Sequence, residues 1–121
     1  MKKRFVWLTL FVGVLILALS STDNVWAQAA PRRVEITAKR FAFEPGEITL
    51  KKGELVVLVL KSEDVAHGLQ FKELKINVKT TAHGTSEIEF TPDKTGDFMG
   101  HCSVFCGSGH ASMTLKLHVV D

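Results

Sequence analysis

Apolar and polar residues alternate with a period of two along most of the chain after position 30. This alternation covers residues 34–39, 48–51, 74–79, 87–90 and 113–119. A period of two is typical of a β-strand that buries one face. After position 30, no long stretch repeats apolar positions with the 3.6-residue period of a helix. The pattern therefore predicts an all-β chain.

One segment is apolar without alternation. Residues 55–60 read Leu-Val-Val-Leu-Val-Leu, and such a run predicts a central strand that is covered on both faces. Turn signals separate the expected strands: Pro-Gly at 45–46, Lys-Gly at 52–53 and Thr-Pro-Asp-Lys-Thr-Gly at 91–96. Short strands with frequent turns, in a single domain of about ninety residues, predict a small antiparallel β-sandwich.

The same pattern frames a loop near the C-terminus. Residues 97–102 are expected to form a strand that ends on Cys102, and residues 103–112 are expected to form a loop with glycines at 107 and 109. Met113 then begins the last strand. Since Met113 has the parity of the apolar residues that follow, its side chain is expected to face the core.

This loop concentrates donor atoms for a metal. Both cysteines of the protein, one histidine and one methionine lie in residues 102–113, at spacings of four, four and three. Thiolate, imidazole and thioether groups suit copper better than harder cations. Structural zinc usually takes four Cys or His donors, and a blue-copper site takes one cysteine, two histidines and a weak methionine. Two cysteines can instead bridge two copper ions if one further histidine lies upstream.

Four other histidines compete for that role. His118 lies on the polar face of the last strand, and His83 lies in a polar loop beside Gly84. His101 precedes Cys102 directly, so strand alternation points it the other way. His67 follows the buried strand in a turn. The pattern alone does not decide whether His67 is a metal ligand, because a loop histidine is often only a surface residue.

The N-terminus reads as an export signal. Lys2, Lys3 and Arg4 precede an apolar run over residues 5–19, and a small-residue cleavage site ends at Ala27. The run is shorter than the roughly 20 residues of a membrane span. We therefore expect residues 1–27 to be a secretory signal peptide, with a retained anchor as the alternative, and residues 28–121 to be the folded domain. Both readings export the domain, to the periplasm or the outer face of the cytoplasmic membrane.

Charge and cysteine content narrow the classes of function that fit this chain. The chain has 15 Lys and Arg against 13 Asp and Glu, and removal of residues 1–27 leaves 12 of each. A neutral domain without a basic patch argues against nucleic acid as a partner. In an oxidising compartment the two cysteines could form a disulfide. That bridge would close a very short loop, which constrains the unfolded chain little.

Residues 102–113, Cys-Ser-Val-Phe-Cys-Gly-Ser-Gly-His-Ala-Ser-Met, resemble the binuclear copper A (CuA) loop of cytochrome c oxidase subunit II. The segment Asp-Val-Ala-His-Gly at 64–68 and the turn at 91–96 resemble the same family, so the match covers most of residues 34–121. The Cys-x₃-Cys-x₃-His-x₂-Met spacing, with a histidine 35 positions before the first cysteine, is specific. The family fold is a cupredoxin, a Greek-key β-sandwich, in agreement with the strand pattern.

The resemblance implies six metal ligands: His67, Cys102, Val104, Cys106, His110 and Met113. The two cysteines would bridge both copper ions. His67 and Met113 would complete one ion, and His110 and the backbone carbonyl of Val104 would complete the other. The function implied is one-electron transfer through a mixed-valence pair of copper ions.

The leading hypothesis is therefore an exported CuA cupredoxin that exchanges electrons with a redox protein, either a cytochrome or an oxidase. One alternative is an anchored subunit of a terminal oxidase, through which electrons enter the enzyme. A second is a copper carrier that delivers the metal to a cuproenzyme, and a third is a secreted sandwich held by a disulfide. Catalysis by this chain alone is not expected, because a site with every position filled leaves no coordination open for a substrate. Membrane contact is expected only if the N-terminal segment is retained.

Overall fold

A computed structural model describes residues 30–121, so the expected signal peptide lies outside the described residues. The described chain consists of strands joined by turns, with two single-turn 3₁₀ helices. The elements are β1 (Arg32–Lys39), β2 (Ala42–Glu44), β3 (Glu47–Lys51), β4 (Val56–Ser62), β5 (His67–Phe71), η1 (Lys72–Leu74), β6 (Ile76–Thr80), β7 (Thr85–Phe90), β8 (Gly96–His101), η2 (His110–Ser112) and β9 (Thr114–Val120). Between residues 30 and 121, no helix is long and apolar enough to cross a membrane.

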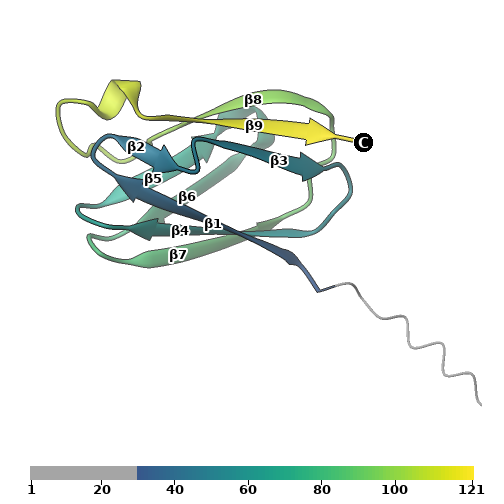
Figure 1. The fold of residues 1–121 in the computed structure, drawn as a ribbon, viewed down its shortest axis with the longest axis horizontal. Helices are drawn as coiled ribbons and strands as arrows, with labels where there is room; N and C mark the ends of the chain where they lie inside the picture. The colour runs from purple at the N-terminus through teal and green to yellow at the C-terminus, as the bar shows by residue number, and fades with distance from the viewer. Residues whose placement is uncertain (1–29) are drawn as a thin grey trace, which may run out of the picture.

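The strands form two sheets that face each other (Figure 1). One sheet has the order β2-β1-β4-β7, and the other has the order β3-β9-β8-β5-β6. The chain passes repeatedly from one sheet to the other, which confirms the predicted all-β sandwich. Strand β4 lies between β1 and β7, as expected for a central strand. On its outer face Val59 is only 2% exposed, but Val57 is half-buried and Leu55, just before the strand, is 37% exposed, so the expected cover of both faces is only partial.

Two strand pairs differ from the antiparallel arrangement expected from the sequence. Strand β1 pairs with β4 in parallel, and β3 pairs with β9 in parallel. The remaining pairs are antiparallel. Alternation reveals which face of a strand is buried but carries no information about the direction of its neighbour. The sequence pattern therefore predicted the layers and could not predict these two pairings.

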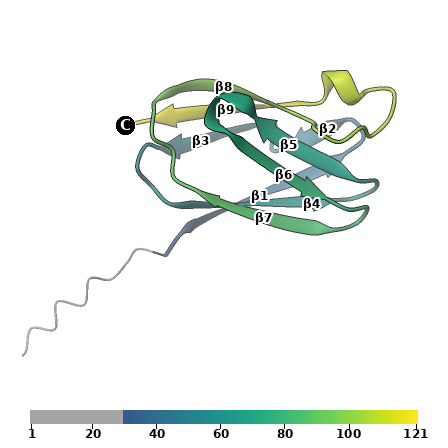
Figure 2. The ribbon, with the colours of Figure 1, turned by 180° about the vertical axis from the view of Figure 1, so that it is seen from behind.

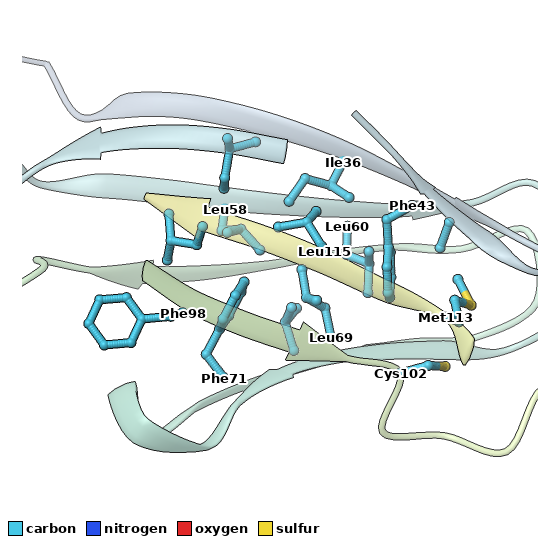
Figure 3. Packing of buried hydrophobic residues seen from close by; sticks show 14 of the residues in the cluster. Ile36, Phe43, Leu58, Leu60, Leu69, Phe71, Phe98, Cys102, Met113 and Leu115 are labelled. Carbon is cyan, nitrogen blue, oxygen red and sulfur yellow. The ribbon is translucent and has the colours of Figure 1, made fainter. Parts of the chain in front are cut away.

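Apolar side chains from both sheets fill the space between them (Figure 3). Leu58 and Leu60 of β4 and Leu115 of β9 are fully buried. Burial of apolar area contributes roughly 25 cal/mol per Å² and is the main favourable term for such a sandwich. In Figure 3, Cys102 and Met113 lie at one end of this cluster, so the core continues directly into the cysteine-containing loop.

Two further details differ from the strand prediction. Leu74 belongs to η1 rather than to the following strand, and the expected loop 103–112 contains η2. Both helices are single turns, which are too short to produce a helical period in the sequence. The loop that carries η2 lies at the same end of the sandwich as the turn between β1 and β2 in both views (Figures 1 and 2).

Candidate metal centre

Two neighbouring antiparallel strands bring Cys102 and Met113 together. Strand β8 ends at His101, which pairs with Thr114 at the start of β9. The N–H of Cys102 donates to the carbonyl of Met113 over 3.2 Å, so the ladder extends one residue beyond the strands. The Cys102 side chain is 6% exposed and Met113 is fully buried, which confirms that Met113 faces the core.

The loop then turns back and places Cys106 beside both residues. The Sγ atoms of Cys102 and Cys106 lie 3.6 Å apart, and Sγ of Cys106 lies 3.8 Å from Sδ of Met113. A disulfide requires about 2.05 Å between its sulfur atoms. The two cysteines are therefore free thiols in this structure, and the disulfide expected by the alternative hypothesis is not formed.

Each thiol has an imidazole as a neighbour. Nδ1 of His110 lies 3.6 Å from Sγ of Cys106. Nδ1 of His67 lies 3.9 Å from Sγ of Cys102. His67 is the first residue of β5 and is completely buried, which resolves the choice that the turn pattern left open between a surface and an interior histidine. The ligand atoms of His67, Cys102 and Cys106 all lie within 4.8 Å of one another.

The backbone supplies a further donor atom. The carbonyl oxygen of Val104 lies 3.1 Å from Sγ of Cys102 and accepts a hydrogen bond from that thiol. The side chain of Val104 takes no part in this contact. The position of the oxygen follows from the backbone of the loop, so the residue type at 104 matters less there than the loop conformation.

Asp64 fixes the orientation of His67. Oδ1 of Asp64 lies 2.6 Å from Nε2 of His67. Since an ionised carboxylate only accepts hydrogen bonds, Nε2 carries the hydrogen and Nδ1 is left with a lone pair toward the thiols. Burial raises the pKa of Asp64, but hydrogen bonds from the N–H of Arg40, from His67 and from the N–H of Val65 outweigh burial and hold this pKa at about 2.

The Cys106 sulfur lies in an environment that disfavours free thiolate. Burial, and then the neighbouring thiol of Cys102, raise the pKa of Cys106 to about 11. A metal cation reverses this preference, because its charge stabilises the thiolates that bind it. The pocket is therefore suited to thiolate only when a cation is bound.

Close contacts hold the loop against the sandwich. A Cβ added to Gly109 would lie 2.3 Å from Cγ of Phe41, so the aromatic ring packs directly on the backbone of the loop. Gly107 has a φ of +135° and also lies against that ring. On the other side, Oγ of Ser103 donates to Oδ1 of Asn77 over 2.7 Å. The loop is thus fixed by contacts with both sheets.

The other three histidines lie away from the thiols. His101 is exposed on the outer face of β8, opposite to the buried Cys102, as alternation predicted. His83 is exposed in the turn before β7. His118 lies on the outer face of β9, as its place in the alternation predicted, and contacts the carboxylates of Asp97 and Glu47, which partly cover it.

Two residues of this region, Asp64 and Phe41, have roles that were not predicted from the sequence. Asp64 was part of the segment around His67 but received no role, although an acid three residues before a histidine in a turn is a recognisable signal for an orienting partner. Phe41 is half-buried and packs on the core, but nothing in the sequence indicated that its ring would contact the glycines of a loop so distant along the chain.

The donor set fits copper. Two thiols, two imidazoles, one thioether and one carbonyl converge at one end of the core, and the described structure leaves no buried side-chain nitrogen or oxygen without a hydrogen-bond partner there. Soft sulfur donors and imidazoles together favour copper over hard cations. The tight backbone contacts hold these donors in place.

Comparison with known proteins identifies the class. A family model described as a cupredoxin-like domain matches residues 8–114. The chain therefore belongs to the cupredoxin-like family, and this family together with the donor set indicates a copper site. The predicted resemblance to cytochrome c oxidase subunit II is confirmed by the relatives below.

The relatives in sequence are longer proteins, each of which the chain matches over one part. The chain is 34% identical over 90 residues to nitrous-oxide reductase of Cupriavidus necator, a match that covers 71% of this chain and 14% of that protein. It is 30% identical over 80 residues to cytochrome c oxidase subunit 2 of Thermus thermophilus, which covers 66% of this chain and 59% of that subunit. The chain therefore spans only part of the length of these relatives.

Solved structures agree on the fold. A heme-copper terminal oxidase dimer is 26% identical, with a TM-score of 0.67 over 78% of this chain and 68% of that chain. The periplasmic domain of subunit II of cytochrome oxidase from Bradyrhizobium japonicum has a TM-score of 0.68 at 20% identity, covering 76% of this chain and 86% of that domain. Auracyanin A, a blue copper protein from Chloroflexus aurantiacus, has a TM-score of 0.64 at 20% identity, covering 75% of this chain and all of that one.

Proposed function

We propose that this protein is an exported copper protein that transfers single electrons through a binuclear CuA site. The observation that carries the proposal is the pair of thiols 3.6 Å apart, each with its own imidazole within 3.9 Å. A mononuclear blue-copper site uses a single cysteine, so the second thiol would have no role there. Two bridging thiolates give a role to every donor.

The proposed ligand set is the one that the resemblance to subunit II implies. Cys102 and Cys106 would bridge both ions, and each thiol lies within 3.9 Å of a donor from each set. His67 and Met113, which are both fully buried, would complete one ion. His110 and the carbonyl oxygen of Val104, which lie on the loop itself, would complete the other.

When bound, two copper ions bridged by thiolates supply a one-electron carrier of mixed valence. The contribution of the chain is to keep the donors still when the charge of the site changes. Cys102 and Met113 are held by the ladder between β8 and β9, His67 is held by Asp64, and the loop is held by Phe41. Fixed donors reduce the reorganisation that accompanies each electron transfer, which favours a relay.

An exposed aromatic residue offers a contact for a redox partner. Phe105 directly precedes Cys106, and its side chain is 79% exposed. Its ring centroid lies 5.6 Å from that of His110. A protein partner that covers Phe105 would therefore approach the loop closely. We infer that this partner is a redox protein, a cytochrome or an oxidase.

The proposed location is the periplasm or the outer face of the cytoplasmic membrane. Two observations support it: the signal-like pattern of residues 1–27 and the description of one structural neighbour as a periplasmic domain. In an oxidising compartment two neighbouring cysteines would ordinarily form a disulfide, and binding of a metal by both thiolates would keep them from doing so.

Copper loading tests the proposal. The full chain is loaded anaerobically, its copper content is measured, and electron paramagnetic resonance spectra are recorded. We expect two copper ions per chain and an unpaired electron delocalised over two copper nuclei. One ion per chain, or a spectrum from one nucleus, would overturn the binuclear site.

Matched variants test the ligand set. His67→Gln and Met113→Leu should change the spectrum, whereas His83→Gln should leave it unchanged, because His83 is exposed away from the thiols. Cycles of reduction and oxidation separate electron transfer from copper delivery. A relay keeps both ions through repeated cycles, whereas a carrier loses copper to a chelator in one oxidation state.

A further inference from the structure

Two potential metal donors on β8 have no role in the buried site. Met99 is 46% exposed, and His101 is exposed as well. They are separated by one residue on a strand, so both side chains extend from the same outer face of the sheet. Cys102, the next residue, is buried on the other side. The thioether and imidazole therefore form a second pair of donors outside the core.

A surface cavity of about 170 Å³ lies beside this pair. Its lining residues come from the end of β5, from η1 and from β8: Phe71, Lys72, Glu73, Phe98, Met99 and His101. Phe71 and Phe98 are 1% and 7% exposed and belong to the core. Two buried aromatic side chains therefore line the cavity together with the two donors.

The donor chemistry selects a soft ion. A thioether binds soft metals such as copper(I), and an imidazole suits copper as well. Calcium and magnesium require six or more oxygen ligands, whereas the only carboxylate on the cavity is that of Glu73. Lys72 lines the same cavity, and exposed Lys116 lies opposite Met99 on β9, so the local charge does not attract cations and the donor atoms decide which ion binds.

We propose that Met99 and His101 form a surface site for a single copper(I) ion, separate from the buried thiol site. Nδ1 or Nε2 of His101 and Sδ of Met99 are the two ligands. The ion lies at the rim of the cavity, where solvent or a donor protein can reach it. No change of oxidation state accompanies binding.

The position suggests what the site does. His101 is the last residue of β8 and Cys102 follows it, so copper held at His101 lies at the end of the strand beside the thiol site, on the opposite face of the sheet. The surface pair captures copper(I), which then passes to the thiols as they release their protons to water. This loading role rests on the proposed function, whereas binding at Met99 and His101 does not.

Silver(I) provides a probe that is independent of the thiols. The full chain with Cys102→Ser and Cys106→Ser is titrated with silver nitrate, and the methyl group of Met99 and the ring of His101 are followed by nuclear magnetic resonance. Both signals should shift together and saturate with one silver ion at this pair, whereas silver held by the remaining buried donors would shift the Met113 methyl. Because even outer-shell partners of metal ligands change affinity by about 10- to 100-fold, Met99→Leu and His101→Gln should each lower it at least about tenfold.

Controls distinguish this site from other donors. His83→Gln and His118→Gln should leave the affinity for silver unchanged. The proposal is overturned if the Met99 methyl does not respond, if Met99→Leu binds as tightly as its parent, or if silver shifts only the Met113 methyl. Should the serine pair fail to give a native far-ultraviolet spectrum, the same titration is made with both cysteines changed to alanine.

A loading experiment tests the role. The wild-type chain and Met99→Leu receive copper(I) from a weak chelator, and the rate of filling of the thiol site is recorded. The variant should fill at least about tenfold more slowly, in line with the expected loss of affinity, and should reach the same final copper content. Equal rates overturn the capture role. If neither chain fills the thiol site with copper, the proposed function fails, whereas the silver titration still tests binding at Met99 and His101.

Discussion

The carboxylate of Asp64 lies 2.6 Å from Nε2 of His67 and so determines which nitrogen of that ring faces the thiols. His67 is completely buried, while the side chain of Asp64 is 31% exposed. The pair therefore connects the buried donor cluster to the surface. Because the pKa of Asp64 is held at about 2, the acid is ionised at neutral pH and acts only as an acceptor.

Removal of this charge should weaken copper binding. Asp64→Asn keeps one acceptor oxygen but loses the negative charge that orients the imidazole and increases its basicity. We expect the copper affinity of the chain to fall by about 10- to 100-fold, measured by competition with a chelator of known affinity. Glu63→Gln is the matched control, since Glu63 is adjacent and exposed. Equal affinity of both variants would contradict an orienting role for Asp64.

Gly109 should not tolerate a side chain. An added Cβ would lie 2.3 Å from Cγ of Phe41, a distance that forces the ring or the loop to move. We expect Gly109→Ala to lower the free energy of unfolding by about 1–3 kcal/mol, the usual cost of overpacking, measured by urea denaturation. Gly46→Ala serves as the control, because its nearest neighbour would be an ordinary contact at 3.7 Å.

A double-mutant cycle assigns this cost to a single contact. In the presence of Phe41→Ala, the ring atoms at 2.3 and 2.5 Å are gone, and of the three close contacts only Cβ of residue 41, at 2.9 Å, remains. The two changes should therefore be non-additive, as expected for residues in contact. Additive effects would show that the cost of Gly109→Ala does not arise from the contact with Phe41.

The strand pattern predicted the position of the site, but it did not predict the contacts and strand pairings that hold the site in place. Alternation placed Met113 in the core and Cys102 at the end of a strand, because burial of one face produces a period of two. The contact between Phe41 and Gly109 and the parallel pairing of β1 with β4 were not predicted. Both depend on how distant strands are arranged, and a one-sided pattern contains no information about the partner strand.

The histidines also show that alternation predicts the face on which a side chain lies but not its neighbours. Alternation correctly directed His101 away from the thiols, since one residue along a strand reverses the face. It also placed His118 on the polar face, but the two carboxylates that flank His118 come from β3 and β8, and only the fold brings them there. The assignment of the six ligands to two copper ions stays a prediction until the metal-loaded protein is measured.

His118 should make stability depend on pH. Hydrogen bonds first to Asp97 and then to Glu47 raise the pKa of His118 in the folded state. A raised pKa means that the folded state binds the proton more tightly than the unfolded state. The stabilisation is therefore fully present below the unfolded pKa of about 6.5 and is lost as the pH rises through the folded value.

The measurement compares unfolding midpoints in urea at pH 5.5, 7 and 9. The wild-type chain should lose stability across this range by a greater amount than His118→Gln, which cannot take up a proton. His83→Gln should follow the wild type, because His83 makes no ion pair in the described structure. A His118→Gln profile that is parallel to the wild type would rule out the three-residue cluster as the cause.

The Cys106 thiol should react slowly until the fold is opened. Burial and the adjacent Cys102 thiol raise its pKa to about 11, against about 8.5 for a free cysteine, so at pH 8 the thiolate population is more than about a hundredfold smaller. We expect iodoacetamide to modify Cys106 of the native, copper-free chain at least about a hundredfold more slowly than in urea. An exposed cysteine introduced by Lys94→Cys gives the reference rate in the same native molecule. The rate at Cys106 should rise about tenfold per pH unit up to its pKa, and a rate equal to the reference would contradict the burial on which the metal-dependent thiolate pair depends.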